Sequence, residues 1–89
     1  MQIEFPEQSA FDFERLSVVF PALVDGQLRR VFVSCEALQD HFGGPTGPMA
    51  DGQSFIDPFE ANRGHIEAIA ERLFRVGAPG DVVLTSASF

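Results

Sequence analysis

The chain has 89 residues, enough for one domain and too few for a second hydrophobic core. Its hydrophobic content of 45%, with ten Phe and no Trp or Tyr, favours a packed core over disorder. A net charge of −7, from 13 acidic residues against six Arg, disfavours nucleic acid and anionic membranes as partners, because both are bound through clustered cations.

The single cysteine, Cys35, excludes an intramolecular disulfide and leaves no cysteine pair or cluster for zinc. No stretch of the sequence is long and apolar enough for a membrane-spanning helix. The first residues, 1–4, lack the basic and apolar regions of a signal peptide. These features predict a cytoplasmic protein with no metal or other cofactor.

The first fifteen residues predict one short strand and a loop. Ile3 and Phe5 alternate with polar neighbours, a pattern typical of an edge strand, and Pro6 ends it. Residues 7–15 are mostly polar and are expected to form an ordered loop.

A β-hairpin follows. Two β-branched segments, 17–24 and 27–34, flank Asp25-Gly26, a pair typical of a two-residue turn. This turn sets a register in which both faces of the hairpin are apolar. On the second face the register brings together Val19, Leu23, Leu28 and Phe32. Because an exposed patch of this size marks an interface, we expect loops of the chain or a second subunit to cover it.

A short helix and a loop come next. Ser34 is a favourable N-cap and Gly43 a favourable residue after the helix end, with Cys35, Leu38 and Phe42 on the buried side. Residues 43–52 are rich in Gly and Pro and predict a mobile loop.

The main helix is predicted to start at the N-cap Asp57, with Pro58 in its first position, and to end at Gly77. Ser54 offers an alternative start one turn earlier. Helical periodicity places six apolar residues in one buried stripe: Phe59, Ile66, Ile69, Ala70, Leu73 and Val76. Residues 81–89 predict a final strand.

Together these elements predict one two-layer α+β domain over residues 1–89. An antiparallel sheet is expected to pack against two helices in the order β-β-β-α-α-β. The predicted core consists of Ile3, Phe5, Val18, Phe20, Val31, Val33, Leu38, Phe42, Phe59, Ile66, Ile69, Ala70, Leu73 and Leu84.

Several segments match a known bacterial family in their order along nearly the whole chain. They are Ile3-Glu4-Phe5-Pro6, Val19-Phe20-Pro21-Ala22, Ser34-Cys35-Glu36-Ala37-Leu38, Phe42-Gly43, Phe59-Glu60-Ala61-Asn62-Arg63, Ile66-Glu67 and Ala70. The chain therefore resembles the domain of unknown function 1488 (DUF1488) family. It departs from the family at the 43–52 loop and at Ser88, where an acidic residue is more typical. The resemblance implies a small α+β fold and transfers no activity or catalytic residue.

Two polar residues of the main helix are the candidate functional residues. Asn62 falls inside the apolar stripe, where an amide without partners costs about 1–3 kcal/mol. We therefore expect it to be buried and hydrogen-bonded to backbone outside its own helix. Arg63 lies at the edge of the stripe, where its stem can pack and its guanidinium can reach a carboxylate. Both serve either to hold the helix on the sheet or to bind a carboxylate-bearing ligand or partner; the structural role is favoured.

Other polar residues give weaker signals. Cys35 and His41 are six residues apart and point away from each other on a helix, which disfavours a catalytic pair. His65 lacks a metal-ligand partner at helical spacing and could meet His41 only through tertiary structure. The glutamates of the main helix form a solvated face, so we predict no catalytic residue and no metal site.

These observations predict a small non-catalytic binding or regulatory module, expected to be a homodimer or to bind another protein. The alternative is a small ligand-binding protein or minor enzyme that uses Arg63 and Asn62 with a nearby acid. A pocket that holds both residues would favour the alternative, whereas a fully paired arrangement would favour the module. A DNA-binding regulator is disfavoured by the acidic composition.

Overall fold

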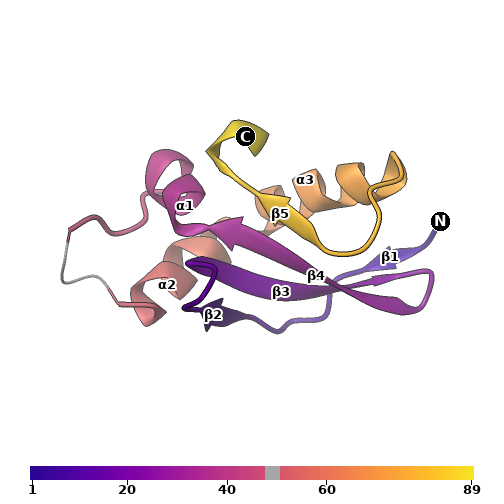
Figure 1. Ribbon diagram of the computed structural model, residues 1–89, viewed down its shortest axis with the longest axis horizontal. Helices are drawn as coiled ribbons and strands as arrows, with labels where there is room; N and C mark the ends of the chain where they lie inside the picture. The colour runs from indigo at the N-terminus through magenta and orange to yellow at the C-terminus, as the bar shows by residue number, and fades with distance from the viewer. Residues whose placement is uncertain (48–50) are drawn as a thin grey trace.

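The structure is a computed structural model that describes residues 1–47 and 51–89. Its strands are β1 (Ile3–Glu4), β2 (Ala10–Asp12), β3 (Ser17–Val24), β4 (Gln27–Ser34) and β5 (Val82–Leu84). Its helices are α1 (Cys35–His41), α2 (Gln53–Ala61), α3 (Arg63–Arg75) and the 3-10 turn η1 (Ser86–Ser88). Within the described residues the strands form one sheet, and α2 and α3 lie against one side of it (Figure 1). The predicted two-layer α+β fold is confirmed.

The hairpin of β3 and β4 forms the centre of the sheet, and its predicted register is confirmed. Asp25 and Gly26 both have positive φ, 52° and 81°, as a two-residue hairpin turn requires. Phe20 lies opposite Val31 and Val19 lies opposite Phe32. Successive residues along each strand therefore point alternately toward the helices and away from them.

The strands at the edges differ from the prediction. β2, which lies inside the expected loop 7–15, pairs antiparallel with β3 beside β1. β5 runs parallel to β4, with Val82 opposite Val31, so the sheet is mixed rather than antiparallel. The reason is the connection between them: the chain passes through three helices and returns to the sheet in the direction of β4, as parallel pairing requires. The expected strand 81–89 ends at Leu84, and η1 follows.

Helix α1 has the predicted ends. Ser34 Oγ accepts a hydrogen bond from the Ala37 N–H at 3.0 Å, which makes it the N-cap. Gly43 has a φ of 69°, and the Gly44 N–H then donates to the carbonyl oxygen of Leu38 at 2.8 Å. Of the loop predicted at 43–52, positions 48–50 lie outside the described residues.

The predicted main helix is divided into α2 and α3. α2 begins one turn before Asp57, and Asp51 Oδ1 accepts hydrogen bonds from the Ser54 N–H (3.0 Å) and Oγ (2.8 Å). Pro58 therefore lies inside α2, where its ring removes one helical N–H donor. The break follows at Asn62, whose φ and ψ of −121° and 16° are not helical.

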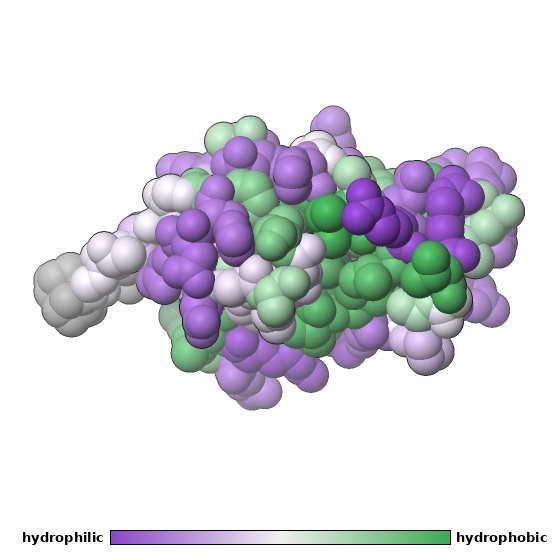
Figure 2. All heavy atoms as spheres, turned by 90° about the horizontal axis from the view of Figure 1, so that it is seen from above, coloured by the Kyte–Doolittle hydropathy of each residue, from purple (hydrophilic) through white to green (hydrophobic). Residues whose placement is uncertain are grey.

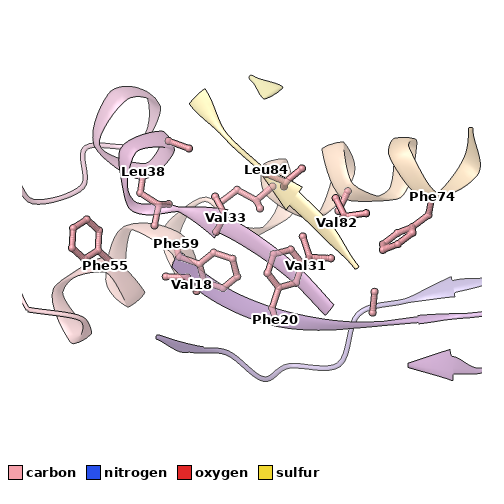
Figure 3. Packing of buried hydrophobic residues seen from close by; sticks show 14 of the residues in the cluster. Val18, Phe20, Val31, Val33, Leu38, Phe55, Phe59, Phe74, Val82 and Leu84 are labelled. Carbon is pink, nitrogen blue, oxygen red and sulfur yellow. The ribbon is translucent and has the colours of Figure 1, made fainter. Parts of the chain in front are cut away.

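The core lies between the inner face of the sheet and the helices (Figure 3). Every predicted core residue either is buried or packs, partly buried, against the buried cluster, so the predicted core is confirmed. Val76 was wrongly placed in the helical stripe: it is 76% exposed because α3 ends at Arg75. Phe74, which is 1% exposed, fills the end of the core instead.

The cap of α1 provides a test of this local structure. Ser34→Ala removes the acceptor for the Ala37 N–H and should reduce the free energy of unfolding by about 1 kcal/mol. Ser34→Asp keeps an acceptor at the same place and should remain close to the wild type. Urea unfolding followed by circular dichroism measures both variants, and equal losses would contradict the role of the cap.

Candidate functional site

Asn62 breaks the helix through its side chain. In a continuous helix the carbonyl of Pro58 would accept the backbone N–H of Asn62. Here Asn62 Nδ2 donates to that carbonyl at 2.8 Å, and the Asn62 N–H donates to Phe59 O at 3.1 Å. The side chain thus replaces its own backbone as the donor. The expected hydrogen bond to backbone outside its own helix was wrong, because Asn62 is only half-buried and its partner lies one turn back in α2.

Arg63 donates hydrogen bonds to four residues in three parts of the chain. Its Nε donates to Glu67 Oε2 at 2.7 Å and its Nη1 to Glu60 Oε1 at 3.1 Å. Its Nη2 donates to the carbonyl oxygens of Pro6 (2.7 Å) and Gln8 (3.2 Å). The side chain is 13% exposed. These contacts commit the guanidinium to partners within the chain, which favours the structural role.

The Arg63 guanidinium also lies over two core rings. Its Cζ is 5.3 Å from the centroid of Phe59 and 5.6 Å from that of Phe20. The two rings are themselves in contact, with centroids 5.1 Å apart. Arg63 therefore covers the end of the aromatic core while it binds the N-terminal segment, a cation–π arrangement in a mostly desolvated place.

A polar hollow of about 460 Å³ lies beside Arg63. Its lining consists of Phe5, Glu7, Glu60, Arg63, Gly64 and Glu67. Three carboxylates against one guanidinium repel an anion, so the hollow does not suit the carboxylate-bearing ligand considered from the sequence. Asn62 is not part of the lining, and the two candidate residues do not share a pocket.

Tertiary structure brings the two histidines to the same ring, that of Phe89. The rings of His41 and His65 lie 5.7 Å and 5.9 Å from the ring of Phe89, and Phe42 completes the cluster. His41 Nε2 is 2.9 Å from the carbonyl oxygen of Ser86. This cluster holds η1 against α1 and α3. Among the described residues no group of three His, Cys, Asp or Glu is arranged to hold a metal ion.

The four residues predicted as an interface lie on the side of the sheet that faces away from α2 and α3, which we call the outer face. Leu28 is 68% exposed, and Val19 and Leu23 are half-buried. Phe32 is only 3% exposed and lies outside the core cluster. The chain itself therefore covers Phe32 and leaves Leu28 open.

Two arginines cover Phe32. The Cζ atoms of Arg15 and Arg30 lie 4.8 Å and 5.3 Å from the centroid of its ring. Asp12 Oδ2 accepts from Arg15 Nη1 at 2.9 Å, and Asp81 Oδ2 accepts from Arg30 Nε and Nη2 at 3.1 Å and 2.9 Å. Sequence analysis missed this arrangement, because the pairing of β5 with β4 is what places Asp81 beside Arg30.

Hydrogen bonds from the backbone also reach both carboxylates. The Arg30 N–H donates to Asp81 Oδ1 at 2.9 Å, and the Arg15 N–H donates to Asp12 Oδ1 at 3.1 Å. These N–H groups, assisted by the guanidinium groups, hold the pKa of each carboxyl below its ordinary value.

An apolar hollow of about 340 Å³ lies at the end of the sheet near α1 and the start of α2. Its lining consists of Phe11, Phe13, Leu16, Cys35, Gln39, Gly47, Asp51, Gly52 and Phe55. Phe13 is 74% exposed and Leu16 is 61% exposed, although both are large and apolar. Leu16 also has a φ of 45°, which is strained for a leucine, and the Cys35 N–H donates to its carbonyl at 2.9 Å. Burial raises the pKa of the Cys35 thiol, which disfavours a nucleophilic role.

The structural role of Arg63 predicts a large loss of stability when it is replaced. Arg63→Met leaves the carbonyl of Pro6 without its partner and should lower the free energy of unfolding by about 3 kcal/mol. Arg72→Met, at an exposed position of the same helix, should change it by less than about 0.5 kcal/mol. Urea unfolding compares the two, and losses of equal size would refute this role.

The lowered carboxyl pKa values predict a loss of stability in acid. A carboxyl whose pKa is lowered by folding stabilises the fold fully above its unfolded pKa, and the contribution disappears as the pH falls through the folded pKa. Asp81→Asn should therefore be less stable than the wild type at neutral pH, and the two should converge below about pH 4. Urea midpoints measured across this range check the prediction, and parallel curves would contradict it.

Comparisons with known proteins agree on the family. The sequence profile of DUF1488, described as a protein of unknown function, matches residues 3–84. A crystal structure of a protein of unknown function from this family, from Shewanella loihica PV-4, superposes with a TM-score of 0.78 over 92% of this chain and 90% of that chain. The two sequences are 22% identical, so this likeness shows the fold alone. No curated protein matches the chain. No helix in residues 1–47 and 51–89 is long and apolar enough to cross a membrane. The chain belongs to the DUF1488 family.

Proposed function

We propose that the chain is a small, non-catalytic binding or regulatory module of the cytoplasm that acts as a homodimer. In this role the module binds its partner protein at the apolar hollow beside Phe13 and Leu16. The alternative of a ligand-binding protein or minor enzyme at Arg63 and Asn62 has less support. Arg63 is engaged within the chain, and the hollow next to it is lined by three glutamates.

The observation that carries the proposal is the exposure of Phe13 and Leu16 on the turn between β2 and β3. A monomeric domain rarely presents two large apolar side chains at the rim of a hollow unless they meet a partner. The ring of Phe13 lies edge-on against Phe11, with centroids 4.8 Å apart, and Phe11 in turn stacks on the buried Phe55 at 5.8 Å. The exposed ring is therefore held by the core, which preorganises the surface for binding.

The hollow suits an apolar side chain of a protein partner. Its walls are mainly aromatic and aliphatic, and its volume of about 340 Å³ is at the lower end of the range for ligand pockets. Interfaces of this kind depend on a few aromatic anchors in a desolvated centre. The strained backbone of Leu16, whose carbonyl accepts the Cys35 N–H, holds its exposed side chain at the rim of the hollow.

Affinity capture from cell lysate with matched variants tests the binding role. Phe13→Glu places a charge in the proposed contact and should remove the specific partner from the captured proteins. Val76→Glu introduces the same charge at an equally exposed position on the other layer and should retain the partner. Quantitative mass spectrometry compares both with the wild type.

Two outcomes would count against the proposal. If the three proteins capture the same set, the hollow does not bind a partner. If instead a small molecule copurifies with the wild type and is lost in Arg63→Met, folded as judged by circular dichroism, the ligand-binding alternative is correct.

A further inference from the structure

Four apolar residues are aligned across four strands of the outer face, and Arg15 and Arg30 cover one of them, Phe32. The strand pairing aligns Ala10 of β2 with Val19 of β3, Val19 with Phe32 of β4, and Phe32 with Val83 of β5. Residues aligned across strands point to the same side of a sheet. Val83 is 59% exposed at one end of the row, and Ala10 is exposed at the other. We call these four residues the apolar row.

The apolar surface continues toward the hairpin turn. Leu28, which is 68% exposed, pairs with Leu23 farther along the same face. Between this pair and the row lies a shallow groove of about 260 Å³, whose lining includes Val19, Pro21 and Leu28. No helix of the described residues packs on this side, since α2 and α3 both contact the opposite face (Figure 1).

The apolar surface also reaches the edge of the sheet. Seen from the side of β5 and α3, the molecule shows a central apolar area bordered by hydrophilic residues (Figure 2). β5 is the edge strand there, since it pairs with β4 alone. A contact on the outer face can therefore extend as far as Val83.

The charges that flank the row cancel one another. Arg15 and Arg30 lie over Phe32, and Asp12 and Asp81 pair with them, so two positive charges meet two negative charges. Glu4 is aligned with Leu23 and therefore lies on the same face, toward the hairpin turn and outside the row. The chain as a whole carries −7, so its negative charge lies elsewhere. The row is thus a place where two acidic copies can approach without strong repulsion.

We infer that the outer face is a homodimer interface in which the apolar rows of two copies pack against each other. This inference rests on the proposed function in one respect, the homodimer. A second copy fits better than a charged partner, because the balanced charges around the row offer no attraction to a strongly basic or acidic protein. An apolar row whose flanking charges cancel also matches itself, as the symmetric interface of a dimer requires.

The expected arrangement is a sandwich of two sheets. The inner faces of two packed sheets lie about 10 Å apart, so the side chains of Val83 and Leu28 would be buried between the two copies. The guanidinium groups of Arg15 and Arg30 remain over the ring of Phe32 and present their exposed sides to the other copy. Arginine and aromatic residues are enriched in the centres of interfaces, where both lose water on binding.

Sedimentation velocity of the full chain tests the inference at micromolar concentrations. The wild type should sediment as a dimer. Val83→Arg adds a third positive charge and removes apolar surface, and we expect at least about a tenfold weaker dimer. Val76→Arg makes the same change at an equally apolar position that is 76% exposed and lies on the helical layer, and it should leave the dimer intact.

Leu28→Arg, at the far end of the face, tests the same interface if Val83→Arg fails to fold. It should weaken the dimer in the same direction, and circular dichroism checks that each variant is folded. Raising the salt concentration should strengthen the wild-type dimer, because screening reduces the repulsion between the two acidic copies. A monomeric wild type, or a folded Val83→Arg or Leu28→Arg that dimerises like the wild type, would overturn the inference.

The two proposals fail separately. If Phe13→Glu loses its partner while Val83→Arg remains a dimer, the binding role stands and the interface on the outer face is wrong. If Val83→Arg becomes monomeric while Phe13→Glu captures the same proteins as the wild type, the interface stands and the binding role of the hollow is wrong.

Discussion

The guanidinium of Arg63 is the interaction on which the assembly of the two layers depends. It extends from the first turn of α3, lies over Phe20 of the sheet and Phe59 of α2, and donates to the carbonyl of Pro6 in the N-terminal segment. A single side chain thereby contacts helix and sheet at once and binds the segment before β2. Such a group is stable at 13% exposure only because Glu60 and Glu67 neutralise its charge. A polar residue at the edge of an apolar stripe, which resembles a binding residue in the sequence, thus has hydrogen-bond partners within the fold.

Asn62 acts on the direction of the chain through its side chain. By donating from its side chain to Pro58 O, it ends α2 and allows α3 to start at a new angle. The consequence is that Ile66, Ala70 and Phe74 reach the inner face of the sheet, where they complete the core. Asn62 and Arg63, adjacent in the sequence, thus perform two separate structural tasks that share no pocket.

The surfaces that remain open define what the molecule can do. The hollow at Phe13 lies at the end of the sheet, where α1 and the start of α2 form part of its wall, whereas the apolar row lies on the face that α2 and α3 do not cover. One is a concave aromatic site at the end of the sheet, and the other is a sheet face on which the four charges around the apolar row cancel. Concave sites suit single anchoring side chains, whereas flat apolar faces suit another sheet. A module with two surfaces of different shape can dimerise through one and bind a partner through the other.

The sequence by itself determined the local structure. The register of β3 and β4, the cap at Ser34 and the core residues follow from the Asp25-Gly26 turn, from capping preference and from hydrophobic periodicity, all of which act between near neighbours. Tertiary structure alone decided the rest. The parallel direction of β5, the strand β2, the start of α2 and the pairing of Arg30 with Asp81 depend on contacts between distant segments. The break at Asn62 is an intermediate case, because its side chain competes locally for the Pro58 carbonyl, yet the stripe of apolar residues favours a continuous helix. Hydrophobic periodicity indicates which residues become buried. The hydrogen-bond or ion-pair partner of each polar side chain depends instead on which distant segments the fold places beside it.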